Sequence, residues 1–430
     1  MPESNLLLSA LSEANPLPRL LMGPGPINAD PRVLRAMSAP LLGQFDPQFR
    51  AFMRDTQALY RAVFETANAH TLCIDGTARS AIETVMVSLI EPGDRVLVAS
   101  FGRFGQLKAE IARRVGADVR VLDAVWGTVF DPAQIQAAIA AFSPKLVACC
   151  QGDTSTTMLQ PLADLGALCR RHGAMLQVDA TASLCGTPLP VDAWQIDCVT
   201  GALQKCLAGP SGIAPITLSD TLGEVIMHRR HVEEGLRPAG YVAGAGRIIG
   251  SNYFDLAMII DYWSERALNH HTEATTMLYA ARECARIFLQ EGAARVHARH
   301  ALASRAVSAG LTAMQLKLFG DPVHRMPNVT GVWIPDGVDG ERVRRALLEE
   351  FNIEIGTSFG PLQGRIWRIG TMGYNARCDA VLTTVAALET VLAGEHHRFT
   401  RGAGVDSARA VYREARGDPA MSPAPPVPAA

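Results

Sequence analysis

The sequence lacks several features that mark special classes of protein. Its 40 Lys and Arg residues are balanced by 42 Asp and Glu residues, so no excess of positive charge is available to neutralise nucleic-acid phosphates. No apolar run reaches the roughly 18 residues that are needed to cross a bilayer. The first twenty residues have an early acidic residue and no basic segment, which is not typical of a signal peptide. We therefore expect a protein that binds neither nucleic acid nor a membrane.

The nine cysteines form no CxxC pair, and most of them stand in apolar segments. This pattern favours small core residues in a reducing compartment over a disulfide framework or a zinc site, so we expect a cytoplasmic protein. With 430 residues, 48% of them apolar, the chain can bury a large core and is expected to form about two domains.

Helical periods alternate with short apolar runs from about residue 50 to residue 220. The expected helices include 48–66 and 104–116, and the expected strands include 94–100 and 119–124. Strands that alternate with helices of ten or more residues pair in parallel through crossover helices. The sequence therefore predicts an α/β fold.

The rest of the chain has a different character and indicates a second domain. Residues 253–292 look mostly helical, and later segments mix helices with short strands. We expect an N-terminal arm (1–20), a large domain (21–265), a smaller α+β domain (266–398) and a disordered tail (399–430). The tail is rich in Ala, Pro and Arg, a composition that buries little apolar surface.

Chemically useful side chains stand at four connections of the expected sheet. Asp179 ends one strand, Lys205 follows another, segment 151–156 follows a third, and segment 75–79 precedes the helix expected from Ser80. Ligands of an open parallel sheet bind at the carboxyl ends of its strands. An amine, a carboxylate, hydroxyl groups and a glycine turn at a helix N-terminus are thus expected to share one rim.

This combination suits pyridoxal 5'-phosphate (PLP). Lys205 would bond the cofactor aldehyde, and Asp179 would keep the pyridine nitrogen protonated, so that the ring accepts electrons. Hydroxyl and backbone N–H groups at a helix start bind phosphate, and Phe104 is placed to pack on the ring face.

Several stretches, in their order and spacing, resemble the class V aminotransferases of PLP fold type I, in the branch of the alanine–glyoxylate and serine–pyruvate enzymes. The resemblance covers about residues 18–395. Its matching stretches include LLMGPGPINADPRVLRAM, GTARSAIETVMVSLIEPGDRVLV, GDTSTTMLQPL, LQVDATASLCGTPLPVD, TGALQKCLAGPSGIAPITLS and IWRIGTMGYNA. The resemblance implies a large domain with a mostly parallel seven-stranded sheet, a smaller domain, and a homodimer with active sites at its interface.

The resemblance also implies residue roles around the cofactor. Lys205 would carry the cofactor and move the proton, and Asp179 would pair with the pyridine nitrogen. Thr181 would lie against the ring face opposite Phe104. Thr272 would reach in from the second subunit. The phosphate and the ring edge would be held by residues with backbone or side-chain donors: Thr77, Ala78, Arg79, Thr154 and Gln204.

For the substrate, the resemblance implies that Arg368 clamps the carboxylate and that Gly25 adds a backbone donor. Two positions depart from the alanine–glyoxylate pattern, because Gln44 replaces a His and Asn269 replaces a Tyr. A carboxamide donates and accepts hydrogen bonds at once, as a ureido group does. The stretches GQFDP and NHHTEAT therefore resemble the ureidoglycine–glyoxylate enzymes of purine breakdown, which convert (S)-ureidoglycine and glyoxylate to oxalurate and glycine.

Each assignment has a plain structural alternative. Lys205 could be a solvated surface residue, Arg368 an ion-pair partner, and Asp179 or Asn269 a helix cap, while Gln44 could be a satisfied loop amide. These alternatives require no ligand at all.

Other functions share parts of this pattern. A serine– or alanine–glyoxylate (pyruvate) aminotransferase differs only in its amino donor. A cysteine desulfurase would need an exposed cysteine in a Gly-rich loop, and a PLP-binding regulator would need a DNA-binding domain; neither is evident. His270 and His271 invite a metal interpretation, but adjacent histidines on an extended segment point apart and no third ligand is spaced nearby, so no metal is expected.

Overall fold

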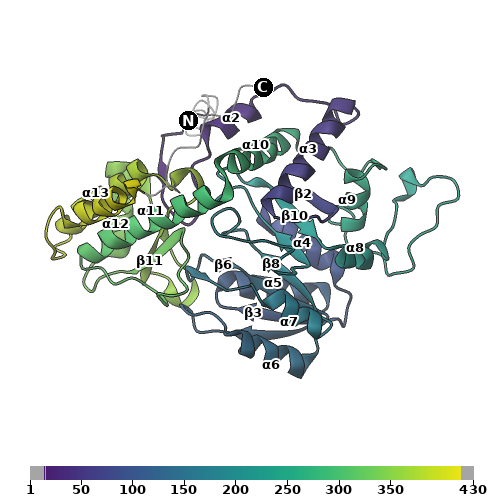
Figure 1. Cartoon of the computed structure of the whole chain (residues 1–430), viewed down its shortest axis with the longest axis horizontal. Helices are drawn as coiled ribbons and strands as arrows, with labels where there is room; N and C mark the ends of the chain where they lie inside the picture. Colours follow the sequence, from purple (N-terminus) through teal and green to yellow (C-terminus); the bar gives the residue numbers. More distant parts are fainter. Residues whose placement is uncertain (1–13, 15, 418–430) are drawn as a thin grey trace, which may run out of the picture.

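The computed structural model describes residue 14 and residues 16–417, and a seven-stranded sheet lies at its centre (Figure 1). The strand order is β2-β10-β9-β8-β5-β3-β4, in which β10 is antiparallel to both neighbours and the other pairs are parallel. The predicted α/β fold with a mostly parallel seven-stranded sheet is confirmed. The strands are β2 (His70–Gly76), β3 (Arg95–Ser100), β4 (Asp118–Asp123), β5 (Leu146–Cys150), β8 (Met175–Asp179), β9 (Cys198–Thr200) and β10 (Gly212–Leu218).

Helices cover both faces of the sheet. The chain moves outward from β3 to β4 and returns from β4 to β5, so right-handed crossovers place the two connecting helices on opposite faces. The central strand β5 is wholly buried, whereas the edge strand β4 is partly exposed along its length. The helices are α2 (Pro31–Met37), α3 (Pro47–Val63), α4 (Ala78–Leu89), α5 (Arg103–Val115), α6 (Pro132–Phe142), α7 (Leu165–Arg171), α8 (Asp220–Met227), α9 (Leu256–Trp263) and α10 (Thr275–Glu291).

Local sequence signals explain where these helices begin and end. α6 begins with a capping box between Asp131 and Gln134, with Pro132 in its first turn. α5 ends at Gly116, whose φ of +101° is the left-handed conformation that glycine adopts without steric cost. These caps satisfy helix-end groups that would otherwise lack hydrogen bonds.

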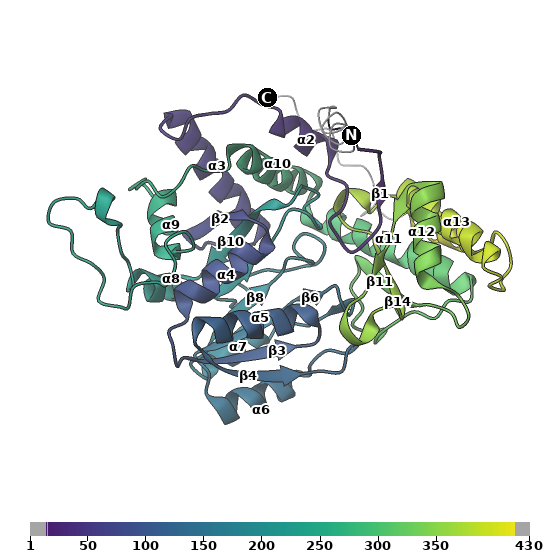
Figure 2. The same cartoon turned by 180° about the vertical axis from the view of Figure 1, so that it is seen from behind.

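A smaller lobe with its own hydrophobic core lies beside the large sheet (Figure 2). Trp367 is fully buried in this core, and its indole N–H donates to the Gly340 carbonyl at 3.1 Å. The lobe is built from β11 (Val329–Trp333), β13 (Gly356–Thr357), β14 (Ile366–Gly370), α11 (Ala293–Ala313), α12 (Gly340–Phe351), α13 (Cys378–Gly394) and α14 (Ala403–Glu414).

The N-terminal segment joins the two lobes. β1 (Leu20–Leu21) pairs in parallel with β12 (Ile353–Glu354), and Met22 is buried in the smaller core. The next residues then run back to the large sheet, where Gly25 meets Lys205. The pairing of β1 therefore fixes a backbone segment beside the rim of the large sheet.

The structure corrects three expectations. The tail was predicted to be disordered from residue 399, but α14 occupies Ala403–Glu414 and packs against α11 and α13; residues 418–430 lie outside the described part. The two helices α11 and α14 approach closely, since a Cβ at Gly310 would lie 3.1 Å from the Gly404 carbonyl. Small residues at this contact take the place of large apolar ones.

The predicted helical region 253–292 is interrupted after Trp263. One cysteine, Cys378, is exposed.

No helix among the described residues combines the length and the apolar character that crossing a membrane requires.

Candidate active site

A cavity of about 220 Å³ opens at the carboxyl ends of the large sheet's strands. It gathers nine of the ten residues that the sequence places around the cofactor, the exception being Thr272. Gly152 and Ala182 complete its wall. The nine are Thr77, Ala78, Arg79, Phe104, Thr154, Asp179, Thr181, Gln204 and Lys205.

Lys205 lies in the loop between β9 and β10 and is almost completely buried. Its Nζ donates a hydrogen bond to the Pro24 carbonyl. Burial, followed by the positive charge of Arg368, lowers the pKa of Lys205 to about 8, although Cys206 and Asp179 act in the opposite direction. About one tenth of this amine is therefore neutral at pH 7, far more than for a lysine with its ordinary pKa, and this neutral form can act as a nucleophile.

Asp179 ends β8 and lines the same cavity. Its Oδ1 accepts a hydrogen bond from the Thr181 backbone N–H at 2.8 Å, and its Oδ2 lies 3.9 Å from the Cys150 thiol. Among the residues that the structure describes, only one of the two carboxylate oxygens thus has a strong donor. The Thr181 hydroxyl and Gln204 Oε1 are buried without a hydrogen-bond partner among the described residues. Such buried polar atoms require a partner from a ligand or from water.

The turn at Thr77 begins α4 beside the cavity. Thr77 is the N-cap residue of this helix, yet within the described structure its side chain makes no capping hydrogen bond. Gly76 has a φ of +109°, and a Cβ there would lie 2.8 Å from the Ser80 hydroxyl, so the turn requires glycine. A helix N-terminus with free backbone N–H groups is suited to binding an anion such as phosphate.

Phe104 is held in the first turn of α5 by Asp153, a buried carboxylate of segment 151–156 to which the sequence assigned no individual role. Asp153 Oδ2 accepts from the Phe104 backbone N–H at 2.9 Å, and Oδ1 accepts from the Ser155 hydroxyl at 2.6 Å. Ser155 Oγ in turn accepts from the Arg103 backbone N–H at 2.9 Å. Burial raises the pKa of Asp153. The stretch GDTST stands out in the sequence, but the target of its aspartate depends on tertiary packing.

Arg368 comes from the smaller lobe, on β14, and is buried. Its Nε donates to the Thr357 carbonyl at 2.6 Å and its Nη1 to the Thr154 carbonyl at 2.7 Å. Burial lowers the pKa of this guanidinium to about 10. The second contact ties the arginine to a residue of the cavity wall, and in the described structure Nη2 has no hydrogen-bond partner.

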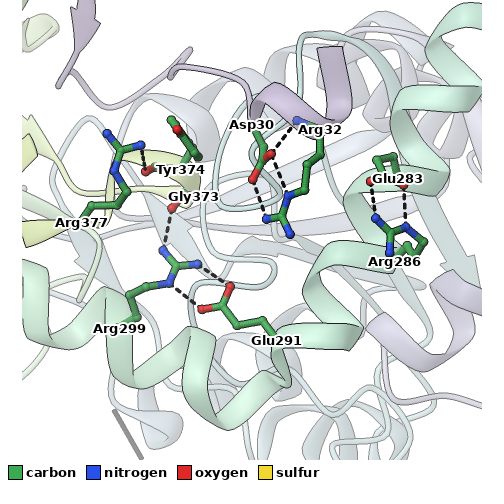
Figure 3. Close-up of polar contacts among 9 residues, drawn as sticks. All are labelled: Asp30, Arg32, Glu283, Arg286, Glu291, Arg299, Gly373, Tyr374 and Arg377. Carbon is green, nitrogen blue, oxygen red and sulfur yellow. Dashed lines mark hydrogen bonds and ion pairs between the residues drawn. The ribbon is translucent and has the colours of Figure 1, made fainter. Parts of the chain in front are cut away.

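Arg299 of α11 makes polar contacts with Glu291 of α10 and with Gly373, which follows β14 (Figure 3). Arg299 pairs with Glu291 at 2.6 Å and donates to the Gly373 carbonyl at 2.7 Å. The backbone N–H of Gly373 donates to His300 Nε2 at 2.8 Å, and burial lowers the pKa of His300 to about 3, which keeps this imidazole neutral. A Cβ at Gly373 would lie 2.7 Å from the Lys205 carbonyl, so this backbone contact requires glycine.

Five predicted residues do not line the cavity of their own chain: Gly25, Gln44, Asn269, Thr272 and Arg368. Gln44 lies before α3 with its Oε1 buried and, in the described structure, without a partner. Asn269 and Thr272 are exposed on the segment that joins α9 to α10. Gly25 is outside the cavity wall but lies directly against Lys205. The predicted roles of Gln44, Asn269 and Thr272 in a shared site remain predictions.

Comparisons with known proteins agree with this geometry. The sequence profile of the class-V aminotransferases matches residues 41–362. The (S)-ureidoglycine–glyoxylate transaminase of Bacillus subtilis is 50% identical over 399 residues, which cover 92% of this chain and 96% of that protein. A crystal structure of ureidoglycine–glyoxylate aminotransferase from Bacillus subtilis superposes with a TM-score of 0.88 at 48% identity, covering 94% of this chain and 100% of that chain.

A more distant relative is the alanine–glyoxylate aminotransferase of Drosophila melanogaster, which is 35% identical over 85% of this chain and 91% of that protein. The resemblance inferred from sequence motifs is therefore confirmed in three ways: by the family profile, by relatives that align over most of the chain, and by the similarity of the fold. This chain belongs to the class-V aminotransferase family.

Proposed function

We propose that this protein is a PLP-dependent (S)-ureidoglycine–glyoxylate aminotransferase, which yields oxalurate and glycine in purine breakdown. The observation that carries the proposal is the shared cavity of Lys205 and Asp179, in a chain that is 50% identical to a transaminase of that specificity over 92% of its length. An amine and a carboxylate in one enclosed site are the two groups that this cofactor needs most.

The residues present fit PLP. Lys205 would hold the aldehyde carbon, Asp179 the ring nitrogen, and the α4 N-terminus at Thr77 the phosphate. The buried Thr181 hydroxyl and Gln204 Oε1 would gain the hydrogen-bond partners that they lack in the described chain. When bound, PLP would supply an aldehyde for the amino group and a ring that withdraws electrons from the neighbouring carbon.

Each protein group then has a defined task. Lys205, with its pKa lowered to about 8, would take the proton from the substrate's α-carbon. It would then deliver this proton to the cofactor carbon that had carried the aldehyde. Asp179 would hold a proton on the ring nitrogen through its Oδ2. Phe104, fixed through Asp153, would restrict the plane of the ring.

Arg368 would bind the carboxylate that ureidoglycine and glyoxylate share. The carbonyls of Thr357 and Thr154 orient its guanidinium, while Nη2 is left for a ligand. Since the same carboxylate occurs in both half-reactions, one arginine can serve the two substrates in turn.

We further propose a homodimer with shared active sites. Gln44 and Asn269 would pair with the ureido group, and Thr272 would reach the partner's phosphate site. Large apolar side chains stand on either side of Gln44 in the sequence and are exposed, Phe45 to 83% and Leu41 to 70%, which supports coverage of this segment by a second subunit. We also retain the division into a large domain (21–265) and a smaller one (266–398), and a cytoplasmic location, as proposals.

A half-reaction screen tests the function. The PLP form is mixed with single amines, including ureidoglycine generated in place, and conversion to the pyridoxamine form is followed by absorbance; glyoxylate should then restore the PLP form. Ureidoglycine is expected to react faster than alanine or serine. Faster conversion by alanine or serine would instead establish the alternative of an alanine– or serine–glyoxylate aminotransferase, and no conversion by any amine would contradict both.

A further inference from the structure

Three side chains of metal-ligating type meet next to the phosphate turn, outside the cavity described above. Asp75 is at the end of β2, and His271 and Glu273 lie on the segment between α9 and α10. His271 Nε2 lies 3.2 Å from Asp75 Oδ2 and 3.7 Å from Glu273 Oε2, and one ligand atom from each residue falls within 4.8 Å of the other two. The sequence argument against a metal does not hold here, because Glu273 is only two residues after His271 and Asp75 comes from a distant segment.

The hydrogen bonds of the two histidines determine which ring nitrogen faces the carboxylates. His270 Nε2 lies 3.0 Å from the Asn252 carbonyl, which can only accept, so this nitrogen carries the proton. In the neutral ring the single proton is then on Nε2, and Nδ1 is an acceptor. His271 Nδ1, at 2.7 Å from that atom, must then donate. A neutral His271 consequently presents a bare Nε2 lone pair to Asp75 and Glu273.

The cluster is enclosed, and no positively charged side chain of residues 16–417 pairs with its carboxylates. Glu273 is only 3% exposed, and within the described chain neither of its carboxylate oxygens accepts a hydrogen bond. Asp75 Oδ1 is likewise buried without a partner. Arg50, a cation near Glu273, directs its guanidinium to the Tyr262 and Ala267 carbonyls instead. Two buried carboxylates and an imidazole lone pair that face one another are unfavourable unless a cation or protons neutralise them.

We infer that Asp75, His271 and Glu273 bind one divalent first-row transition metal ion, for which Zn²⁺ is the natural probe. Tetrahedral ligands at about 2.0–2.2 Å from an ion are roughly 3.3–3.6 Å apart, close to the 3.2 and 3.7 Å observed. A dication would balance the two carboxylates. An imidazole among the ligands favours zinc or its neighbours over magnesium or calcium, which prefer oxygen alone. His270 would orient the ligating ring, as outer partners of metal-bound histidines do.

The position of this site suggests what the ion would do. Asp75 precedes the phosphate turn at Thr77 by two residues, and the Ala274 backbone N–H donates to Asp75 Oδ2 at 3.0 Å. Asn269 and Thr272 belong to the same segment as His271. The ion would join the phosphate turn to the segment that, on the proposed function, enters the partner's active site. The metal site itself does not depend on that function, because binding can be measured without turnover.

The test measures metal in the holoenzyme, purified without a metal-affinity resin. Zinc per chain is determined by mass spectrometry after chelation and after reloading with Zn²⁺, and the melting temperature is recorded in both states. We expect one tightly bound ion per chain and a higher melting temperature with Zn²⁺ than with chelator. A wild-type protein that takes up no ion and shows no shift would overturn the inference and leave a shared proton as the neutralising species.

Variants locate the ion. Glu273→Gln keeps the shape of the side chain but removes its charge, and should weaken Zn²⁺ binding by more than about a hundredfold, beyond the loss typical of outer partners. Asp321→Asn removes a carboxylate from a surface pair with His324 at 2.6 Å and should bind Zn²⁺ as the wild type does. Equal binding by both variants would place the ion elsewhere. If Glu273→Gln does not fold, His271→Gln answers the same question.

Discussion

Gly25 lies in direct contact with Lys205. A Cβ at position 25 would come within 2.8 Å of Lys205 Cε and nearer still to Nζ, while the neighbouring Pro24 carbonyl accepts a hydrogen bond from the same amine. The backbone that makes these contacts is positioned by the pairing of β1 with β12 in the smaller lobe. The location of the reactive amine is therefore set by both lobes.

We predict that Gly25→Ala displaces this amine. The methyl group and Lys205 cannot occupy the same space, and a displacement of about 1 Å of a reacting group costs roughly a hundredfold in kcat. Gly93→Ala is the matched control, because Gly93 has a φ of +90° but a methyl group there would have no other atom within 4 Å. Both variants should lose about 1 kcal/mol of stability from backbone strain. Equal kcat values in steady-state assays would contradict the steric argument.

The lowered pKa of Lys205 predicts a pH-dependent stability of the protein stripped of PLP. Between pH 8 and 10.5 the unfolded lysine holds a proton that the folded one has lost, so the free energy of unfolding rises with pH in this window. Lys205→Met should therefore stabilise the apoprotein below pH 8, by up to about 3 kcal/mol, with a gain that shrinks toward pH 10.5. Urea titrations from pH 7 to 10 compare the free energies of unfolding of the two apoproteins. A gain in stability that does not change with pH would contradict a lowered pKa of Lys205. The same substitution should abolish turnover and the visible absorbance of bound cofactor.

Asp153 is predicted to support cofactor binding indirectly. Asp153→Asn replaces one acceptor oxygen with an NH₂ group, which cannot accept from both the Phe104 N–H and the Ser155 hydroxyl as the carboxylate does. We expect Phe104 to shift and the dissociation constant of PLP to rise about tenfold, corresponding to the loss of one hydrogen bond to a charged group. Asp131→Asn, which alters an exposed cap of α6, should leave PLP binding unchanged. Fluorescence titration of the apoproteins compares them, and identical constants would remove Asp153 from the site.

The α/β fold class and the meeting of the lysine and the carboxylate on one rim could be predicted from local sequence order, whereas the seven-stranded sheet and the roles of most cavity residues were implied by the family resemblance. The central strands are short apolar runs, and ligands collect where parallel strands end, so Asp179 and Lys205 could be placed on one rim without coordinates. Side-chain contacts between segments that are distant in sequence could not be predicted in this way. The partner of Asp153 is the N-terminus of α5, and the partner of His271 is Asp75, and neither pairing leaves a periodic signal.

The error at the C-terminus has a different cause. Composition suggested disorder from residue 399, but α14 needs few large apolar residues, since Gly404 and Ala408 allow its backbone to lie close to α11. Small residues let two helices approach closely and bury surface area between them. The sequence of α14 therefore has a low content of large apolar residues although the helix is packed.

This packing predicts a stability effect in α14. Ala408 is fully buried, and Ala408→Leu would force three additional carbon atoms into the contact with α11, at a cost of about 1–3 kcal/mol. Arg409→Leu adds an apolar side chain at the neighbouring exposed position and should change stability by less than about 0.5 kcal/mol. Thermal or urea unfolding distinguishes the two; if Ala408→Leu is as stable as Arg409→Leu, α14 does not pack as described.

The last prediction concerns the amino donor. If the carboxamides of Gln44 and Asn269 pair with a ureido group, then Gln44→His combined with Asn269→Tyr removes groups that both donate and accept. A site built for such hydrogen bonds discriminates strongly, because its polar groups are left unpaired by the wrong substrate. We expect kcat/KM for ureidoglycine to fall by at least about a hundredfold relative to that for alanine or serine, with glyoxylate as the acceptor throughout. Gln48→His, on the exposed face of α3, changes the same residue type four positions away and should keep the wild-type preference. An unchanged ratio in the double variant would show that these two amides do not select the donor, even if the transaminase activity itself is present.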